Sequence, residues 1–314
     1  MVNSTALSSK NVFFLSPSEG ATVYFPFLFK RLNANQKINE AELYNLTSQA
    51  IWQLFDKERS QISRRLDVSE LDIILADARV LSVLLDGSKV INPLDFSART
   101  IEIYLAVTLM KRPVENIPPF FSLKKETSLV FEPNAALARQ LKEESKEQKF
   151  ILAAADKEKT HFYLAEPAGK IIYLDSFDWG ENRLIGGIME NFGVPEESAK
   201  EMLNYYLSRQ TSFYYFQKFK AHFSRLMAEL LYGITAILYN NKMAKEPVYV
   251  SGQLIGSVDK NHWQFKAGQP RLRFIFSGDK EALVKQELKS LADHKDLNQF
   301  TRQRIKWLIP SVNK

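Results

Sequence analysis

Apolar and polar positions along this chain follow the two-residue period of β-strands in several stretches, some of them continuously apolar over the length of a strand. Residues 12–29 are typical of two strands joined by a turn at 16–20, where serine, proline and glycine gather. Further strands are predicted at 71–87, 99–110, 150–155, 161–167, 170–177, 247–252 and 271–278. Among these, 161–167 and 170–177 are expected to form a hairpin around Ala168 and Gly169.

Between these stretches the apolar positions recur with the helical period. The longest early helix is predicted to begin at Asn39, a capping residue type, with Glu40 and Glu42 in its first turn, and to run to Leu66. Other helices are predicted at 132–146, 184–192, from 195 onward, at 213–239 and at 295–309. Strands and helices follow one another in both halves of the chain, which predicts an α/β fold with two related lobes.

Composition narrows the class of protein. The chain has 314 residues, enough for two or three domains, and 45% of them are hydrophobic and 25% charged, as in soluble globular proteins. Its 42 basic and 36 acidic residues give 42 − 36 = +6, a balance that we ascribe to solvated surface, so no nucleic-acid partner is expected. No apolar run is long enough for a spanning helix or a signal peptide, and we expect a cytoplasmic protein.

Several kinds of site are excluded by residue counts. Cysteine is absent, so disulfides, thiol catalysis and cysteine metal sites are ruled out. The four histidines are too far apart in sequence for a His-x-x-x-His metal pair. There are only 12 glycines, about half the roughly 7% that is usual. Glycine scarcity disfavours phosphate-binding loops, whose backbone must approach the ligand closely.

Three segments together resemble one family, the bacterial actin-fold protein FtsA: residues 84–110, 130–141 and 151–203. The resemblance implies a two-lobed actin-like (ribonuclease-H-like) α/β fold with a small inserted α+β subdomain. Residues 1–67 and 121–148 would form the first lobe, 68–120 the inserted subdomain, and 149–309 the second lobe, in which 295–309 would be an amphipathic C-terminal helix.

In that family ATP lies in the cleft between the lobes, held by glycine-bearing turns. The corresponding positions here are Ser16, Ser18, Gly20, Asp156, Thr160, Gly180, Ser251 and Gly252. They depart from the family pattern: Pro17 and Glu19 occupy the first turn, Ala154 replaces the metal-facing carboxylate, and charged residues replace the glycines at 156–159. We therefore expect no catalytic residues, no bound metal and no ATP cofactor. Asp156 is the one candidate for a substitute carboxylate.

The C-terminal helix is a candidate membrane-binding element. Its apolar arc and basic side chains include Phe300, Arg302, Ile305, Lys306, Trp307, Leu308 and Ile309. Such a helix can lie in the interface of an anionic membrane, as the C-terminal helix of the FtsA family does. The alternative is a terminal helix docked on the second lobe. The aromatic run at 213–216 is expected to belong to a core helix rather than to a surface that stacks nucleic-acid bases.

The resemblance implies a function without catalysis. The chain is expected to be an FtsA-like scaffold of bacterial cell division that tethers FtsZ-type filaments or other divisome proteins to the inner face of the membrane and self-associates into protofilaments. One alternative is a PilM-like cytoplasmic scaffold of a type IV pilus inner-membrane platform, a class that clasps a short peptide of a membrane partner. Another is a divergent but active actin-like ATPase.

Overall fold

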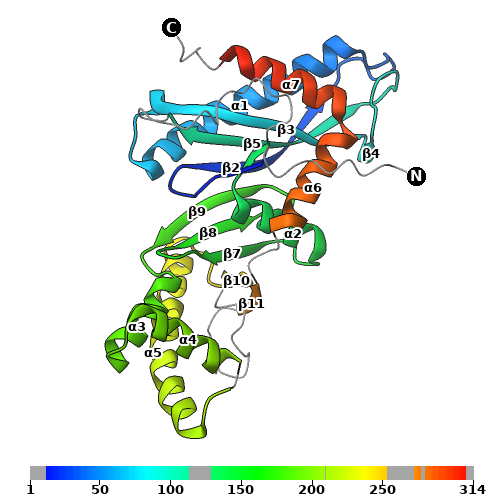
Figure 1. The fold of residues 1–314 in the computed structure, drawn as a ribbon. Coiled ribbons are helices and arrows are strands. Elements are labelled where there is room, and N and C mark those ends of the chain that lie inside the picture. Colours follow the sequence, from blue (N-terminus) through cyan, green and yellow to red (C-terminus); the bar gives the residue numbers. More distant parts are fainter. Residues whose placement is uncertain (1–11, 113–128, 209, 253–271, 277–279, 309–314) are drawn as a thin grey trace, which may run out of the picture. The chain divides into compact units, whose positions relative to one another are not determined.

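The computed structural model describes residues 12–112, 129–208, 210–252, 272–276 and 280–308 (Figure 1). They form two compact units. Unit 1 contains the described residues up to Gln140, Ala168–Ile172 and those from 280 onward, and unit 2 contains the rest. No described helix combines the length and the apolar character needed to cross a bilayer.

The main sheet of unit 1 is antiparallel. It consists of β2 (Gly20–Lys30), β5 (Thr100–Lys111), β3 (Ile73–Leu85) and β4 (Ser88–Val90), in that order. The central strand β5 pairs along its whole length with β2 and is paired on its other side with β3. Most side chains of β3 and β5 are buried, which explains why their sequences are apolar almost without interruption.

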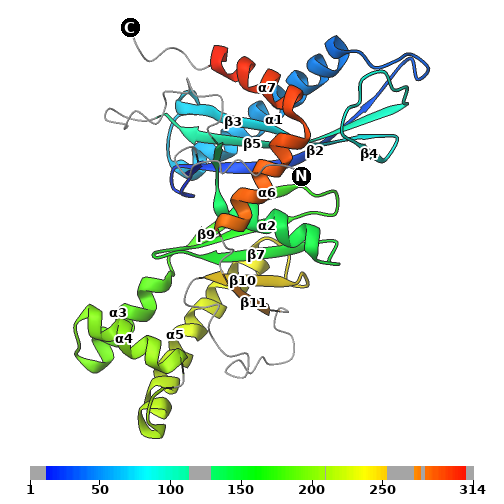
Figure 2. The same ribbon diagram turned by 45° about the vertical axis from the view of Figure 1, so that its right-hand side comes forward.

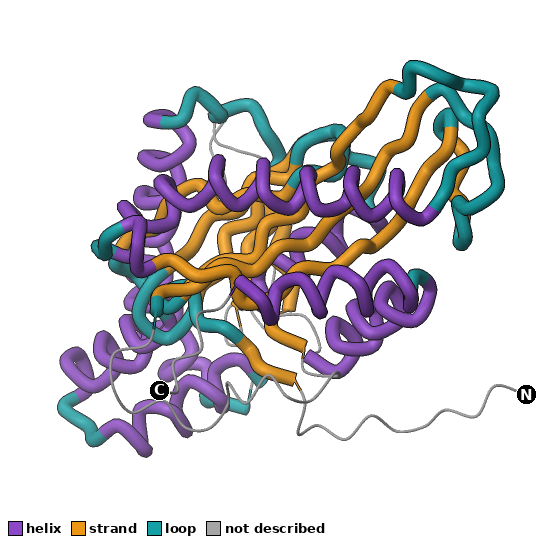
Figure 3. Tube along the Cα trace, turned by 90° about the horizontal axis from the view of Figure 1, so that it is seen from above, coloured by secondary structure: helices purple, strands orange, loops and turns teal. Residues whose placement is uncertain are grey.

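Helix α1 (Glu40–Leu66) lies on this sheet, and Figure 3 shows helices over its strands. The side chain of Asn39 accepts a hydrogen bond from the backbone N–H of Glu42 at 2.8 Å, so the predicted cap is confirmed. The helix ends at Leu66, and the capping residue Asp67 adopts the left-handed conformation with φ 52°. Its apolar stripe, including Leu43 and Leu54, is buried in the core shared with the sheet.

Two C-terminal helices complete unit 1: α6 (Lys280–Asp293), which the sequence pattern did not predict, and α7 (Lys295–Leu308). Both pack against β3, and Leu297 is part of the core that α1 forms with the sheet. The structure thus divides the chain differently from the predicted boundaries. Residues 68–112 share a sheet with β2 instead of forming a separate subdomain, and 280–308 belong to unit 1 rather than to the second lobe.

The first predicted strand pair is also arranged differently. β1 (Val12–Phe14) does not form a hairpin with β2 but pairs in parallel with β6 (Leu129–Phe131). The backbone N–H of Leu15 continues this pairing with a bond to the carbonyl of Phe131 at 2.9 Å. The turn at 16–20 leads the chain away from β1. The pairing partner of β1 lies more than 100 residues away in the sequence, so local periodicity could not predict it.

Unit 2 is built on a mixed sheet in the order β9-β8-β7-β10-β11. The strands are β7 (Phe150–Ala155), β8 (Thr160–Ala165), β9 (Ile171–Phe177, of which Tyr173 onward belongs to unit 2), β10 (Val248–Gly252) and β11 (Leu272–Phe276). β7 and β8 are antiparallel, whereas β10 is parallel to both β7 and β11. Numbered along the chain this order is 3-2-1-4-5, as in the ribonuclease-H-like fold, and the predicted α/β class is confirmed.

Helices α3 (Glu181–Phe192), α4 (Glu196–Leu207) and α5 (Phe213–Asn240) belong to unit 2 and gather together in Figure 2. The ring of Tyr206 in α4 lies 4.8 Å from that of Phe219 and 5.4 Å from that of Phe223. Phe219 and Phe223 of the predicted apolar face are therefore core, as expected. The first turn differs from the expectation for 213–216: Phe213, Tyr214 and Tyr215 are exposed, because consecutive positions of a helix point in different directions. A further helix, α2 (Pro133–Glu144), starts in unit 1 directly after β6 and ends in unit 2.

Candidate functional site

The first turn expected to touch a nucleotide, between β1 and β2, is closed by its own hydrogen bonds. The backbone N–H of Ser16 donates to the Glu19 carboxylate at 3.2 Å, and the hydroxyls of Ser16 and Ser18 lie 2.9 Å apart. The guanidinium of Arg65 donates to the carbonyl of Gly20 at 2.6 Å and also to that of Pro17. The turn therefore offers a carboxylate where a phosphate would need donors.

Gly20 has a packing role. A Cβ atom at this position would lie 2.3 Å from the carbonyl oxygen of Leu109 in β5 and 2.6 Å from the side chain of Leu15. Only glycine lets β2 begin this close to β5. The glycine in the first turn is thus explained by strand packing alone.

The second turn, between β7 and β8, is closed around Asp156. One carboxylate oxygen of Asp156 accepts the backbone N–H groups of Glu158 and Lys159 at 2.8 and 2.7 Å, and the other lies 3.0 Å from Nε2 of His161. Although burial alone would raise it, the hydrogen bonds from His161 and the two backbone N–H groups hold the pKa of Asp156 below its usual value. One oxygen of this carboxylate is thus engaged by its own turn and the other by His161 at the start of β8.

Thr160 and Gly180 join the same closed structure. The hydroxyl of Thr160 donates to the carbonyl of Trp179 at 2.6 Å, and a Cβ on Gly180 would collide with the backbone of Glu158 at 2.3 Å. The first N–H groups of α3 are also taken: Glu181 donates to the carbonyl of Asp156, and Asn182 donates to that of Lys157, both at 2.8 Å. A helix N-terminus that could have bound an anion is capped by the turn.

The remaining predicted nucleotide positions, Ser251 and Gly252, are buried at the end of β10, where they pair with β11. The positions expected for the adenosine-side turn, Gln253 and Leu254, lie outside the described residues. Within the described chain no group of three or more histidine, aspartate or glutamate side chains could hold a metal ion. The described residues of the two turns do not offer the donors and the carboxylate that Mg·ATP needs, and we derive no step through it.

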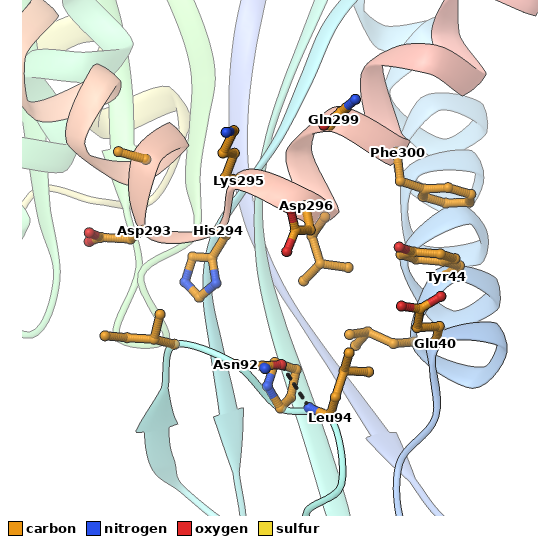
Figure 4. Close-up of a pocket in the computed structure, with 15 residues that line it drawn as sticks. Glu40, Tyr44, Asn92, Leu94, Asp293, His294, Lys295, Asp296, Gln299 and Phe300 are labelled. Atoms are coloured by element: carbon orange, nitrogen blue, oxygen red, sulfur yellow. Dashed lines mark hydrogen bonds between the residues drawn. The ribbon is translucent and has the colours of Figure 1, made fainter. Parts of the chain in front are cut away.

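Unit 1 contains a pocket of about 570 Å³ that the sequence did not indicate (Figure 4). It lies between the start of α1, the loop at 91–94 and the junction of α6 with α7. One wall is the ring of Tyr44, stacked on that of Phe300 with 3.9 Å between centroids and an angle of 8°. The loop is held by the side chain of Asn92, which accepts a hydrogen bond from the N–H of Leu94 at 3.1 Å.

Two carboxylates face the open centre of this pocket. Figure 4 shows Glu40 and Asp296 pointing into it from the first turns of α1 and α7, whereas Asp293 points away. Burial, with smaller effects of the Glu40 and Asp296 carboxylates, raises the pKa of Tyr44. Neither Glu40 nor Asp296 has an ion-pair partner among the described side chains. The pocket is therefore suited to a cationic group of a ligand.

The floor of the pocket holds His294, which is only 3% exposed. The backbone of Ile91 lies near its ring, but neither ring nitrogen makes a hydrogen bond of normal geometry within the described chain. Burial lowers the pKa of His294, with the Asp293 carboxylate opposing this effect. The imidazole is therefore neutral at pH 7 and has an acceptor nitrogen available to a ligand.

A buried charge cluster fixes α6 in unit 1. The Glu287 carboxylate accepts hydrogen bonds from the Tyr24 hydroxyl at 3.0 Å, from Arg139 at 2.9 Å and from Arg79. Arg79 also forms an ion pair with Asp77 at 3.0 Å. Burial, with the Glu287 carboxylate next in effect, raises the pKa of Tyr24. Each buried charge has a countercharge, so we infer that the role of this cluster is to stabilise the fold.

The candidate membrane residues are located on α7, except Ile309, which lies outside the described residues. Phe300 is engaged by Tyr44, so it does not belong to a free apolar face. For Arg302, Ile305, Lys306, Trp307 and Leu308 the structure describes the helix backbone only. The first half of α7 is docked, as one alternative held, but on unit 1 rather than on the second lobe.

No family model matches this sequence, and neither does any curated protein. Among solved structures, one similar to this chain is described as "PilM-PilN type IV pilus biogenesis complex", with 11% identity, a TM-score of 0.41 and coverage of 91% of this chain and 76% of that one. Another is the ethanolamine utilization protein EutJ from Carboxydothermus hydrogenoformans, with 17% identity, a TM-score of 0.33 and coverage of 47% and 49%. At these values neither likeness carries an argument about function.

Proposed function

We propose that this chain is a non-catalytic, actin-like scaffold protein that acts by binding other proteins. The observation that supports this most is the state of Asp156, the one candidate substitute carboxylate: one of its oxygens accepts two backbone N–H groups of its own turn, and the other is bonded to His161 in β8. A metal-dependent phosphoryl transfer requires a carboxylate free to bind or orient the metal. The Ser16–Gly20 turn of unit 1 also supports a function without catalysis, because its polar groups are hydrogen-bonded within unit 1.

The leading role is FtsA-like: tethering FtsZ-type filaments or other divisome proteins to the membrane, with self-association into protofilaments. Its support is the sequence resemblance of 84–110, 130–141 and 151–203. The test is co-sedimentation of the full chain with FtsZ filaments. Recovery in the pellet that depends on filaments supports this role, and absence from the pellet at micromolar concentrations of both proteins contradicts it.

The pocket of unit 1 favours the second role, a PilM-like scaffold that captures a short peptide of a membrane partner. Glu40 and Asp296 would bind a lysine or arginine of that peptide, and the Tyr44–Phe300 wall would pack against its aliphatic stem. The test is fluorescence anisotropy with labelled short peptides that cover the sequence of the pilus inner-membrane partner. Saturable binding supports this role; an unchanged anisotropy up to millimolar protein contradicts it.

A further inference from the structure

The first turn of α5 exposes three consecutive aromatic side chains. Phe213 is 78% exposed, Tyr214 65% and Tyr215 53%. Figures 1 and 2 both show the start of α5 at the end of unit 2 that lies away from its sheet. A single exposed aromatic residue is ordinary. Three in succession at the exposed end of a helix are a candidate binding surface.

The same surface is basic. From Met202 to Ala228 the sequence contains no aspartate or glutamate, and the exposed side chains of α5 there include Lys218, Lys220 and Arg225. The ammonium of Lys218 lies 5.0 Å from the centroid of the Tyr214 ring. At about 100° per residue, Tyr214, Lys218 and Arg225 fall within about 40° of one another on the side of α5 opposite to its buried stripe, and Phe213 lies at the edge of that side.

The aromatic end has a rigid base. Tyr206 of α4 packs on Phe216 with 5.2 Å between ring centroids and on Phe219 with 4.8 Å, and Phe192 of α3 stacks on Phe219 at 5.5 Å. The next turns of α5 are thereby fixed on α3 and α4. The exposed rings at 213–215 are presented by an ordered helix end and need no folding step to meet a partner.

We propose that this surface, Phe213, Tyr214 and Tyr215 with Lys218 and Arg225, binds the headgroup region of an anionic lipid bilayer. Tyrosine rings are suited to the membrane–water interface because one end is apolar and the other is polar, and basic residues add attraction to anionic lipid. A second copy of the chain is a poorer occupant, since a two-fold contact would place like charges opposite each other.

The test is flotation of the full-length protein with vesicles of phosphatidylcholine containing 30% phosphatidylglycerol, and with phosphatidylcholine alone. We expect binding to the anionic vesicles only, weakening as salt increases. The triple substitution F213S/Y214S/Y215S should lower the bound fraction at least about fivefold, and K218E/R225E should lower it by about tenfold. Far-ultraviolet circular dichroism of both variants, unchanged from that of the wild type, checks that α5 is intact.

The matched control is Y232S/Y239S on the same helix. These tyrosines are 79% and 77% exposed, and Tyr232 lies roughly 27 Å along the helix from Tyr214. The control should bind vesicles like the wild type. The proposal is overturned by any of three results: equal flotation of the triple variant and the wild type, equal loss in the control, or a concentration-dependent dimer that the triple variant abolishes without vesicle binding by either protein.

Discussion

The side-chain amide of Asn298 bonds both backbone polar groups of Val80. Its oxygen accepts the N–H of Val80 at 2.7 Å, and its nitrogen donates to the carbonyl of Val80 at 3.1 Å. Val80 lies next to a bulge in β3, where the register with β5 shifts between Val80 and Ser82. One side chain of α7 therefore acts as a neighbouring strand would and closes an otherwise open edge of the sheet.

Replacing Asn298 by alanine should destabilise unit 1. Two buried backbone groups of Val80 would lose their partners, at a cost of about 1–3 kcal/mol in the free energy of unfolding. The measurement is the urea midpoint followed by circular dichroism. Gln299→Ala, at the next and exposed position, is the control and should leave the midpoint unchanged. Equal midpoints for N298A and the wild type would show that α7 does not close this edge.

Glu287 should be the most sensitive position in α6. Glu287→Gln would leave Arg79 and Arg139 buried without their common countercharge, with an expected loss of about 3–5 kcal/mol. Thermal unfolding of E287Q is compared with that of Lys285→Ala, a substitution at an exposed position of the same helix. A decrease of under about 0.5 kcal/mol in the free energy of unfolding of E287Q would show that this cluster does not stabilise the fold.

Local elements of this fold could be predicted from sequence, and long-range partners could not. The cap at Asn39 and the strands of unit 2 depend on neighbouring residues and periodicity, and the structure confirms them. The parallel pairing of β1 with β6 and the return of α6 and α7 to unit 1 depend on contacts far apart in the chain. α6 itself was missed although its apolar residues, such as Leu283, have helical spacing.

The candidate site too could be predicted only where local sequence decides its properties. Proline and glutamate in the first turn, and charged residues in the second, predict from residue type that these turns do not bind phosphate, because phosphate-binding turns need glycines and free backbone donors. The pocket could not be predicted, since Glu40, the loop at 91–94 and His294 meet only when α7 docks. His294 stands between two charged residues in the sequence, so nothing in its neighbourhood predicted that it is buried.

If the pocket binds a basic peptide, only one of two aspartates beside it should affect the affinity. Asp296→Asn should weaken binding of a basic partner peptide about tenfold, because its carboxylate faces the pocket beside Glu40. Asp293→Asn is the matched control and should have little effect, because Asp293 points away. Anisotropy titrations at low and high salt measure both. Equal losses for the two variants would show that general surface charge, and not the pocket, attracts the peptide.

The bonded Asp156 turn predicts a pH dependence of stability. The pKa of Asp156 is lower in the folded state than in the unfolded state, so its contribution is complete above the unfolded value of about 3.9 and is lost as pH falls through the folded value. The melting temperature of Asp156→Asn should therefore lie below that of the wild type at pH 6, and this difference should shrink toward pH 3.

The control for this titration is Asp178→Asn, since Asp178 is largely exposed and pairs only with the exposed Lys159 among the described residues. Its melting temperature should follow that of the wild type at each pH. A difference between D156N and the wild type that stays constant from pH 6 to pH 3 would mean that the Asp156 carboxylate is not held by its turn.

The central claim is that the chain acts without nucleotide, and isothermal titration of the full-length protein with ATP and magnesium tests it most directly. The account predicts no saturable heat at up to millimolar Mg·ATP and no phosphate release, because both expected turns are closed by their own bonds. Micromolar binding accompanied by turnover, with the phosphate release abolished in Asp156→Ala, would contradict the account and establish an active ATPase.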